Sequence, residues 1–437
     1  MSDTQATRKQ PRRTHEHRTA IIFFGLTVQE YLQAAADRVR SMAVVAKALL
    51  EYATLQHHPN CAGTGRFTRH HHDTRTARSD QTGLYERPIW QVRCLDCQVV
   101  FTVLPSFILR YQRFDAGCAQ HLLEIALVMN VSSRHTNLML SSASPTTFAP
   151  AVYWRFMRWR GQLIPVTRVL RRLGLTPPRS MITDEKFTHE TGRRTYVPAM
   201  VQQELLWAID DVAQSDEETL KAFYRAFLTE VHAISPDDRR RGALQDGWQP
   251  AHKALQAVCP RVVLGACHLH AKRRMSQALV QYHKQHPQGS PAEWQALPAQ
   301  HDHVLAAPRL FTFAQRLRRV PEVFRTDPGL RKRSASLQRK KQRLTAWTTK
   351  PLPTTTTALD QLFKWLDRKL FSRQTLRAGI SARATANAWA IVRNFWRYLP
   401  GARRAGQSPV ELAGADLKGI PWLQVLNLLT MGAWSQA

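Results

Sequence analysis

The stretch from Ala243 to Arg274 constrains the fold of this chain most, because it contains two short apolar runs that each end in reactive side chains. The first run ends at Asp246, and the second ends at Cys267 and His270. A segment with helical patterning, about 252–258, separates the two runs. Buried strands of α/β proteins deliver side chains to their carboxyl ends, where ligands bind. We therefore expect two neighbouring strands with a site at their ends.

Three further strands are expected before this stretch. Apolar or alternating segments predict them at 180–186, which ends in an acid at Asp184, at 195–201 and at 205–210. A helix with acids in its first turn, 216–233, follows them. Three meandering strands followed by crossover units match a ribonuclease H-like sheet, so the predicted fold class is mixed α/β with a core of that kind.

The charge of the chain indicates the class of its partner. Lys and Arg total 62 against 32 Asp and Glu, which gives a formal net charge of +30. Such a surface attracts polyanions, and nucleic acid is the usual one. Since no apolar run approaches the ~20 residues that a membrane-spanning helix needs, we expect a soluble, intracellular protein with no membrane partner. Six cysteines in such a chain do not suggest a disulfide framework.

Paired Cys and His residues predict a zinc ribbon near the N-terminus. One ligand pair is Cys94 and Cys97, and the other is His58 and Cys61, both at the spacing of a zinc knuckle. Other histidines compete as ligands: His57, His70, His71 and His72. The alternative is two buried thiols beside a solvated basic loop. A redox role for the Cys94 pair lacks the surrounding βαβ pattern of a thioredoxin.

Helical patterning predicts two basic helical regions. Residues 106–176 contain three short predicted helices whose last member is basic, as in a helix-turn-helix, although a helical linker has the same pattern. Residues 271–350 predict a basic helical insertion that contacts backbone phosphates. The basic side chains expected to bind DNA are Arg155, Arg158, Lys272, Arg273, Arg274, Lys364 and Arg368.

Three acids form an ordered set along the chain. Asp184 and Asp246 end predicted strands, and Asp360 lies in the first turn of a predicted helix, Leu359 to Phe371, for which Thr357 is the expected N-cap. Carboxylates that converge from distant segments are what a two-metal site for phosphoryl transfer requires. Mg²⁺, as a hard cation, binds such oxygen ligands.

These motifs resemble those of bacterial insertion-sequence transposases of the DDE superfamily, near the Mutator-like branch. The residues that carry the resemblance are Ile182-Thr-Asp184, Leu244-Gln-Asp246-Gly-Trp248, Cys267-x-x-His270 and Ala358-Leu-Asp360, in the family's order and with a helical insertion before the last acid. The resemblance extends over most of the chain from about His57.

The resemblance implies a DNA transposase that binds the terminal repeats of a mobile element, hydrolyses a phosphodiester at each end and transfers the strand to target DNA. Asp184, Asp246 and Asp360 would hold two Mg²⁺ or Mn²⁺ ions, and the ribbon would hold Zn²⁺. Cys267 and His270 would order the site, and Trp248 would either stack on a base or pack internally. A homo-oligomer on DNA, in the bacterial cytoplasm at the nucleoid, is expected.

The third acid departs from the family pattern, which usually has Glu. Here Asp360 takes its place, and Asp367 and Glu322 are the alternatives. A degenerate or domesticated DNA-binding derivative, or a structure-selective nuclease on the same fold, remains open. The predicted organisation is a basic tail and supporting helix (1–56), a ribbon (57–105), a helix-turn-helix-like region (106–176), the first part of the core (177–270), the insertion (271–350), the last catalytic helix (351–400) and a helical tail (401–437).

Overall fold

The structure is a computed structural model that describes residues 20–24, 67–79, 83–96, 98, 100–105, 107, 115–127, 135, 165–190, 193–233, 242–371, 380–417 and 420–431. The predicted helix at 28–56 and the helix that carries Arg155 and Arg158 lie outside these residues. The chain divides into two compact units, 1–119 with 423–435 and 437, and 120–422 with 436, and each is described by itself.

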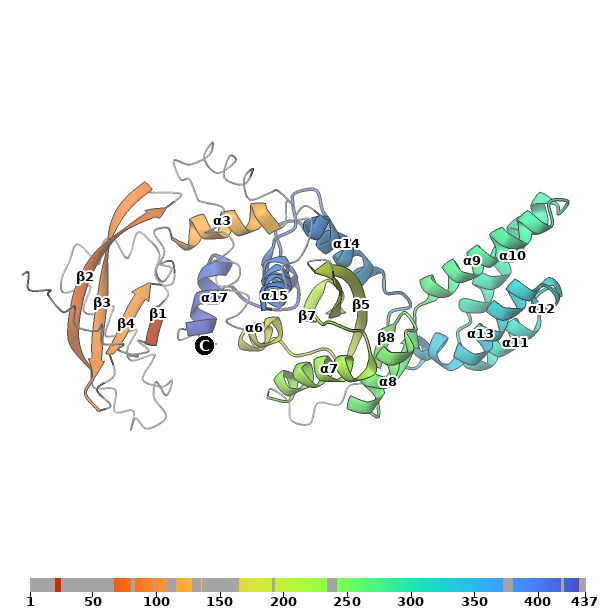
Figure 1. Cartoon of the computed structure of the whole chain (residues 1–437), viewed down its shortest axis with the longest axis horizontal. Coiled ribbons are helices and arrows are strands. Elements are labelled where there is room, and N and C mark those ends of the chain that lie inside the picture. Colours follow the sequence, from red (N-terminus) through yellow and green to blue (C-terminus); the bar gives the residue numbers. More distant parts are fainter. Residues whose placement is uncertain are drawn as a thin grey trace, which may run out of the picture. The chain divides into compact units, whose positions relative to one another are not determined.

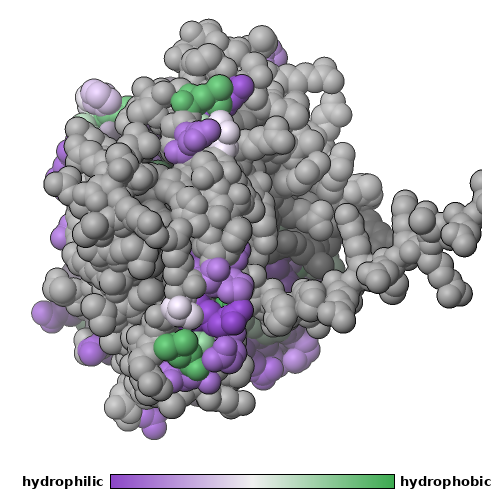
Figure 2. Space-filling model, turned by 90° about the vertical axis from the view of Figure 1, so that its left-hand side faces the viewer, coloured by the Kyte–Doolittle hydropathy of each residue, from purple (hydrophilic) through white to green (hydrophobic). Residues whose placement is uncertain are grey.

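The first unit contains a four-stranded sheet in the order β1-β4-β3-β2 (Figure 1). Its strands are β1 (Ala20–Phe24), β2 (Phe67–Ser79), β3 (Gly83–Cys94) and β4 (Val100–Pro105). The expected strand pair around Cys94 is present, since β3 and β4 are antiparallel, with Trp90 opposite Val103. On the face of the molecule in Figure 2, most of the described residues are hydrophilic and the hydrophobic ones lie in small separate groups.

The His- and Arg-rich interval of this unit is a strand and not the solvated loop of the alternative to a zinc ribbon. Residues Phe67–Ser79 form β2, which pairs antiparallel with β3 along its whole length. The sequence does not predict this strand because the interval is polar at nearly every position, so it has no alternation of apolar and polar residues to mark a strand. Pairing with the more apolar β3 decides its conformation.

The second unit contains the predicted five-stranded sheet, in the order β7-β6-β5-β8-β9. The strands are β5 (Ser180–Glu190), β6 (Arg193–Gln202), β7 (Leu205–Ile209), β8 (Gly242–Gln245) and β9 (Val263–Ala266). The strand β6 is antiparallel to both β5 and β7, and β8 is parallel to both β5 and β9. The protein therefore has a mixed α/β fold in this unit, as the pattern of three strands and two crossovers predicts.

The first strand is longer than expected, which changes the place of Asp184. We expected the strand to end near this acid, but β5 continues to Glu190 as a hairpin with β6. Its pairing with β8 ends earlier, at Ile182 opposite Leu244. Asp184 thus lies where the parallel pairing stops and not where the strand stops.

Helices cover the sheet on both faces. On one face lie α7 (Glu217–His232) and α8 (Gln249–Val258), and the hydroxyl of Tyr224 on α7 contacts the side chains of Thr183, at 3.0 Å, and Gln245, at 3.3 Å. The helix α14 (Thr357–Phe371) packs on β5 and β6 (Figure 1). Since successive side chains of a strand point to opposite faces, Asp184 and Asp246 point away from Tyr224.

The free edge of β7 is covered by side chains of α15 (Ile380–Phe395) and α6 (Val166–Arg172). Asn394 accepts a hydrogen bond from the backbone N–H of Leu206 at 2.9 Å and donates one to its carbonyl at 2.7 Å. The Thr167 hydroxyl donates to the carbonyl of Trp207 at 2.6 Å. These bonds replace a neighbouring strand and leave no open edge at this position.

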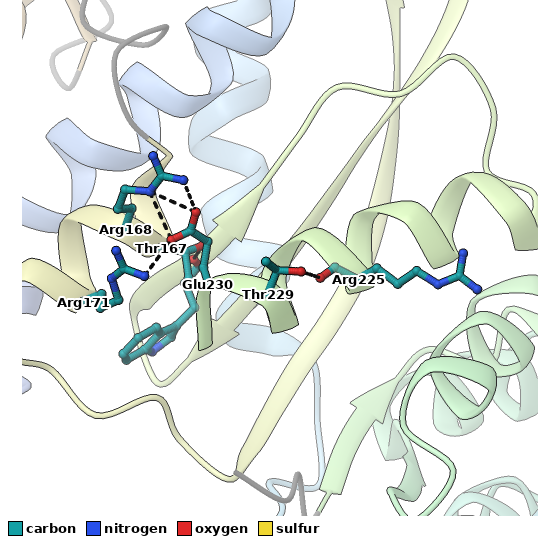
Figure 3. Close-up of polar contacts among 7 residues, drawn as sticks. Thr167, Arg168, Arg171, Arg225, Thr229 and Glu230 are labelled. Atoms are coloured by element: carbon teal, nitrogen blue, oxygen red, sulfur yellow. Dashed lines mark hydrogen bonds and ion pairs between the residues drawn. The ribbon is translucent and has the colours of Figure 1, made fainter. Parts of the chain in front are cut away.

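An ion-pair cluster joins α6 to α7. Glu230 of α7 accepts hydrogen bonds from Arg168 of α6, at 2.9 Å and 3.1 Å from Nε, and Arg171 lies 3.4 Å away (Figure 3). In Figure 3 both guanidinium groups point at the one carboxylate, while the hydroxyl of Thr229, the residue before Glu230, donates to the carbonyl of Arg225 at 3.0 Å. The cluster fixes α6 against α7 at the edge that holds β7.

The predicted insertion is a separate group of helices with its own core (Figure 1). It consists of α9 (His268–Gln285), α10 (Pro291–Leu305), α11 (Leu310–Arg318), α12 (Val323–Thr326) and α13 (Pro328–Leu344), followed by a short 3₁₀ turn (Ala346–Thr348). Met275, Phe313 and Phe324 are buried at its centre. In the described part of the chain, no helix is long and apolar enough to cross a membrane.

The remaining helices are α3 (Ala116–Leu127), α16 (Pro409–Leu412) and α17 (Trp422–Met431). The first lies within the predicted helical region 106–176, and the other two lie within the predicted helical tail 401–437. The predicted segment boundaries at 271 and 351 differ slightly from the observed ones, since α9 already begins at His268 and α14 begins at Thr357.

Candidate active site

Asp184 and Asp246 lie side by side at the end of the parallel pairing between β5 and β8. The register pairs Ile182 with Leu244, and each acid follows its paired residue by two positions. Because side chains two apart on a strand share a face, both carboxylates point to the same face of the sheet. Geometry from two segments 62 positions apart thus brings together the two acids that the sequence singled out.

Asp360 approaches the same place from α14. Its carboxylate is one of the charges that raise the pKa of Asp184, together with those of Asp246 and Glu185. Burial is the largest cause of this rise, and the like charges add to it, so the pKa of Asp184 lies well above its usual range. No ion pair joins Asp184, Asp246 or Asp360 to any other described residue, so this negative charge is left without a cation.

The two alternatives for the third acid have other places. Asp367 forms an ion pair with Lys186 of β5, with 2.8 Å between Nζ and Oδ2. Asp367 follows Asp360 by about two helical turns, and Lys186 follows Asp184 by two strand positions. The helix α14 therefore runs along β5, with Asp360 beside Asp184 and Asp367 beside Lys186. Glu322 directly precedes α12 in the insertion. Of the three, Asp360 is therefore the acid next to Asp184.

Cys267 ties the start of α14 to the end of β9. Both the backbone N–H and the hydroxyl of Thr356 contact its sulfur at 3.3 Å, and the N–H of His268 donates to the carbonyl of Thr354 at 2.8 Å. The insertion leaves the core at this point and returns to it at the same point. Since the carbonyl of Thr356 accepts the N–H of Asp360 at 3.0 Å, the junction also sets the position of the third acid.

The N-cap of α14 is one residue earlier than expected. Thr357 is already the first helical residue, and Thr356 holds the capping position: its carbonyl accepts the N–H of Asp360, and its hydroxyl is 3.5 Å from the Asp360 carboxylate. Four consecutive threonines make the cap ambiguous in the sequence. The contact with Cys267 selects Thr356, which is fully buried.

His270 lies in the first turn of α9 beside Cys267. Burial alone would raise the pKa of the Cys267 thiol, but hydrogen bonds from His270 and Thr356 outweigh it and lower the pKa to about 7. The contact with Cys267 is also the main cause that raises the pKa of His270, and the charges of Asp246 and Asp184 add to it. The predicted C-x-x-H pair is therefore next to the acids, where it supports them electrostatically.

Glu185 is a residue of this site that the sequence reasoning did not single out. Burial and the charge of Asp246 raise its pKa to about 7, although Ser215 donates a hydrogen bond to it at 3.4 Å. The indole N–H of Trp248 donates to the Ser215 carbonyl at 3.0 Å, which holds a ring that is 49% exposed. The signal was available in the sequence, since Glu185 directly follows Asp184.

The predicted DNA-contacting residues differ in their surroundings. Lys272 is paired with Asp302, with 2.9 Å between Nζ and Oδ2. Arg273 and Arg274 are exposed on α9, and Lys364 and Arg368 are exposed on α14. Arg155 and Arg158 lie outside the described residues. Of the exposed cations, Arg274 lines the same pocket as Asp246.

Of the four predicted zinc ligands, only Cys94 is among the residues that the structure describes. Cys94 is buried at the end of β3, and the backbone turns sharply after it, with the N–H of Gln98 bonded to the Cys94 carbonyl at 3.0 Å. His58, Cys61 and Cys97 lie outside the described residues, as does His57. Of the competing histidines, His70 lies in β2 and its Nδ1 is 3.0 Å from the Arg93 guanidinium.

The chemistry of the acids fits a divalent cation better than any group of the chain itself. Hard carboxylate oxygens that repel one another, and that no described cation neutralises, are what Mg²⁺ or Mn²⁺ binds. As they stand, no three His, Cys, Asp or Glu side chains among the described residues form a group that could hold a metal ion. Asp246 and Asp360 are near enough to raise the pKa of Asp184, but the three acids do not form a complete ligand set for a metal ion.

Comparison with known proteins assigns the chain to no family. No protein-family model matches it, and no curated protein matches it. Its function is therefore inferred from the site itself.

Proposed function

We propose that the chain is a DNA transposase of the DDE type, which cuts a phosphodiester at the ends of a mobile element and joins the cut strand to target DNA. The observation that carries the proposal is the convergence of Asp184, Asp246 and Asp360, in the order of the family motif, on one face of the sheet. The net charge of +30, and the cations Arg274, Arg333 and Lys340 that line one pocket with Asp246, support DNA as the substrate.

The topology supports a ribonuclease H-like core. Counted along the chain, the sheet order is third, second, first, fourth and fifth strand, and the second is antiparallel to its neighbours. Asp184 on the first strand and Asp246 after the fourth lie where such a sheet places its acids. The helical insertion between β9 and α14 agrees with the same family pattern.

The residues of the site have separable roles in this proposal. Asp184, Asp246 and Asp360 would hold the two Mg²⁺ or Mn²⁺ ions. When bound, these ions activate the attacking hydroxyl and stabilise the leaving oxygen. Cys267 orients Thr356 and thereby Asp360. Trp248 offers an exposed ring on which a base can stack.

The ribbon-like module of the first unit and the helix-turn-helix-like region that contains Arg155 and Arg158 would recognise the element ends. In this proposal, Cys94, Cys97, His58 and Cys61 hold Zn²⁺ in a ribbon-like module, and Arg155 and Arg158 contact the duplex. The buried position of Cys94 at a turn after β3 supports a knuckle there. Two copies of the chain on paired ends would form the active assembly in the bacterial cytoplasm.

A second candidate is a DNA-binding derivative that has lost catalysis. The observation that favours it is the absence of a ready metal cage among the described residues. The Asp at position 360, where the family usually has the longer Glu, points in the same direction. This candidate predicts binding to DNA with no metal-dependent cleavage.

The deciding experiment incubates the full chain with a duplex that contains the end of its element and a target plasmid, in Mg²⁺ or Mn²⁺. We expect a free 3′-hydroxyl at the element end and a joined product, both of which disappear in Asp246→Asn. The control Asp302→Asn, a surface acid paired with Lys272, should keep both. Cleavage by Asp246→Asn at the wild-type rate would refute the mechanism. Cleavage without joining by the wild-type chain would indicate a nuclease. DNA binding without cleavage by the wild-type chain would indicate the second candidate.

A further inference from the structure

We propose that a pocket between α9 and α13, beside Asp246, binds a backbone phosphate of the DNA strand and so positions that strand at the acids. Its cationic groups are Arg274 of α9 and Arg333 and Lys340 of α13. The inference rests on the proposed function for the identity of the DNA. The pocket itself is argued from its own residues.

The pocket is formed where the insertion meets the sheet. Its lining includes Asp246, His270, Arg274, Arg333, Ser336 and Lys340. The residues Arg333, Ser336 and Lys340 recur at three to four positions along α13, so they form one stripe of that helix. Arg274 lies one turn after His270 on α9. One end of the pocket therefore opens at a predicted catalytic acid, and basic side chains follow from there.

The cations of this pocket form no ion pair with a described residue, and the Asp246 carboxylate lies in the same lining. Arg274, Arg333 and Lys340 take part in no ion pair or hydrogen bond with another described residue, whereas Lys272 on the neighbouring turn is paired with Asp302. Burial and the charges of Arg274, Arg343 and Arg339 lower the pKa of Lys340, and the charge of Asp246 opposes them. A bound anion would relieve this repulsion, so the site favours a phosphate.

Lys340 reaches the glycine that follows Asp246. Gly247 has a φ of 110°, which other residues rarely adopt, and a Cβ atom there would lie 2.9 Å from Lys340 Nζ. The ammonium thus sits against the backbone next to the acid. An apolar floor that includes Leu337 and Met275, both buried, excludes water below it and strengthens the attraction to an anion.

The chain contains a matched control for this pocket. Arg331 lies nine residues before Lys340 on α13, or about two and a half turns, so it points from the opposite side of the helix. Arg331 is exposed. Replacing Arg331 or Lys340 by Met removes one positive charge from the same helix. Of these two variants, Lys340→Met alone removes a charge of the pocket.

The test measures binding of the full chain to a duplex of mixed sequence between about 50 and 200 mM salt. Each lost phosphate contact lowers the slope of log affinity against log salt by about 0.9. We expect this change for Lys340→Met and for Arg333→Met, and an unchanged slope for Arg331→Met. Because Lys340 is repelled by its neighbours, Lys340→Met should melt at or above the wild-type temperature, which shows that the variant folds.

A second measurement uses inorganic pyrophosphate as the probe. It should protect Lys340, but not the exposed Lys332, from acetylation, as read by mass spectrometry. A wild-type slope in Lys340→Met, or equal acetylation of Lys340 with and without pyrophosphate, would overturn the pocket. Altered slopes in a chain that never cleaves DNA would keep the pocket and refute the transposase. DNA cleavage by the wild type, together with an unchanged salt slope in Lys340→Met, would keep the transposase and refute the pocket.

Discussion

Asp184 is a carboxylate buried against Asp246 and Asp360, and no described cation pairs with it. Burial and these like charges raise its pKa, so the folded chain holds the proton of Asp184 more tightly than the unfolded chain does. The linkage has a definite sign. Stability falls as the pH rises above the unfolded pKa of about 3.9, because ionising the group costs more in the folded state. Ionised Asp184 therefore destabilises the folded chain, and the divalent cation of the proposed function would remove this cost.

The first prediction follows from this strain. Asp184→Asn should raise the melting temperature of the metal-free protein by about 2–4 °C for each kcal/mol of relieved repulsion, and the gain should grow with pH. Mg²⁺ or Mn²⁺ should stabilise the wild type and have less effect on the variant. Calorimetry at several pH values measures both effects. Asp302→Asn is the control, and a melting temperature of Asp184→Asn below that of the wild type would contradict the account.

The third acid offers a second prediction at the same scale. Asp360→Asn should abolish strand cleavage, whereas Asp367→Asn should keep it, because Asp367 is taken by Lys186. Asp360→Glu should also remain active, since the longer carboxylate keeps the same donor atoms. Initial rates on an element-end duplex decide. Loss of cleavage in Asp367→Asn with normal cleavage in Asp360→Asn would exchange the two assignments.

At the scale of elements, short contacts between helices and strands place the site. The sheet provides Asp184 and Asp246, but α14 reaches them because Cys267 and His268 bind Thr356 and Thr354 where the insertion returns. At the far edge, Asn394 completes β7 in place of a sixth strand. Residues distant in sequence thus replace regular backbone pairing at both ends of the sheet.

The ion-pair cluster of α6 and α7 carries the element-scale prediction. Hydrogen bonds from Arg168 lower the pKa of Glu230, so its contribution to stability is complete above the unfolded pKa of about 4.3 and is lost as the pH falls through the lower folded value. Glu230→Gln should cost about 1 kcal/mol or less at neutral pH, because Arg168 is partly exposed.

Denaturant titrations from neutral pH downward check this prediction. The difference between wild type and Glu230→Gln should shrink as the solution becomes more acidic than about pH 4. Glu218→Gln removes an acid of the same helix whose side chain is 78% exposed, and it should change stability little at any pH. A difference for Glu230→Gln that stays constant down to low pH would show that packing, and not charge, holds α6 to α7.

At the scale of the whole molecule, the net positive charge and the carboxylates of the candidate site have different roles. The net charge of +30 is spread over a chain whose described catalytic candidates are all anionic. Such a surface attracts DNA, and the cations of α9, α13 and α14 lie next to the carboxylates that would act on it. The insertion has its own buried core and contributes the phosphate pocket, so it is more than a spacer between β9 and α14.

The sequence by itself determined the strands of the central sheet, the helices between them and the ordered acids. Their apolar runs are short and buried, so local hydrophobic periodicity identifies them. It also predicted the helix with acids in its first turn, which is α7, with Glu217 and Glu218 in that turn. These features depend on a few neighbouring residues, and each is visible in a short window of the chain.

The tertiary structure alone decided which groups meet. The strand β2 has no pattern of its own, and its pairing with β3 makes it a strand. The choice of Asp360 over Asp367 depends on Lys186, the cap at Thr356 depends on Cys267, and Glu185 joins the site through burial beside Asp246. Such contacts join positions far apart in the chain, and their energies depend on burial and distance, which no local window of sequence contains.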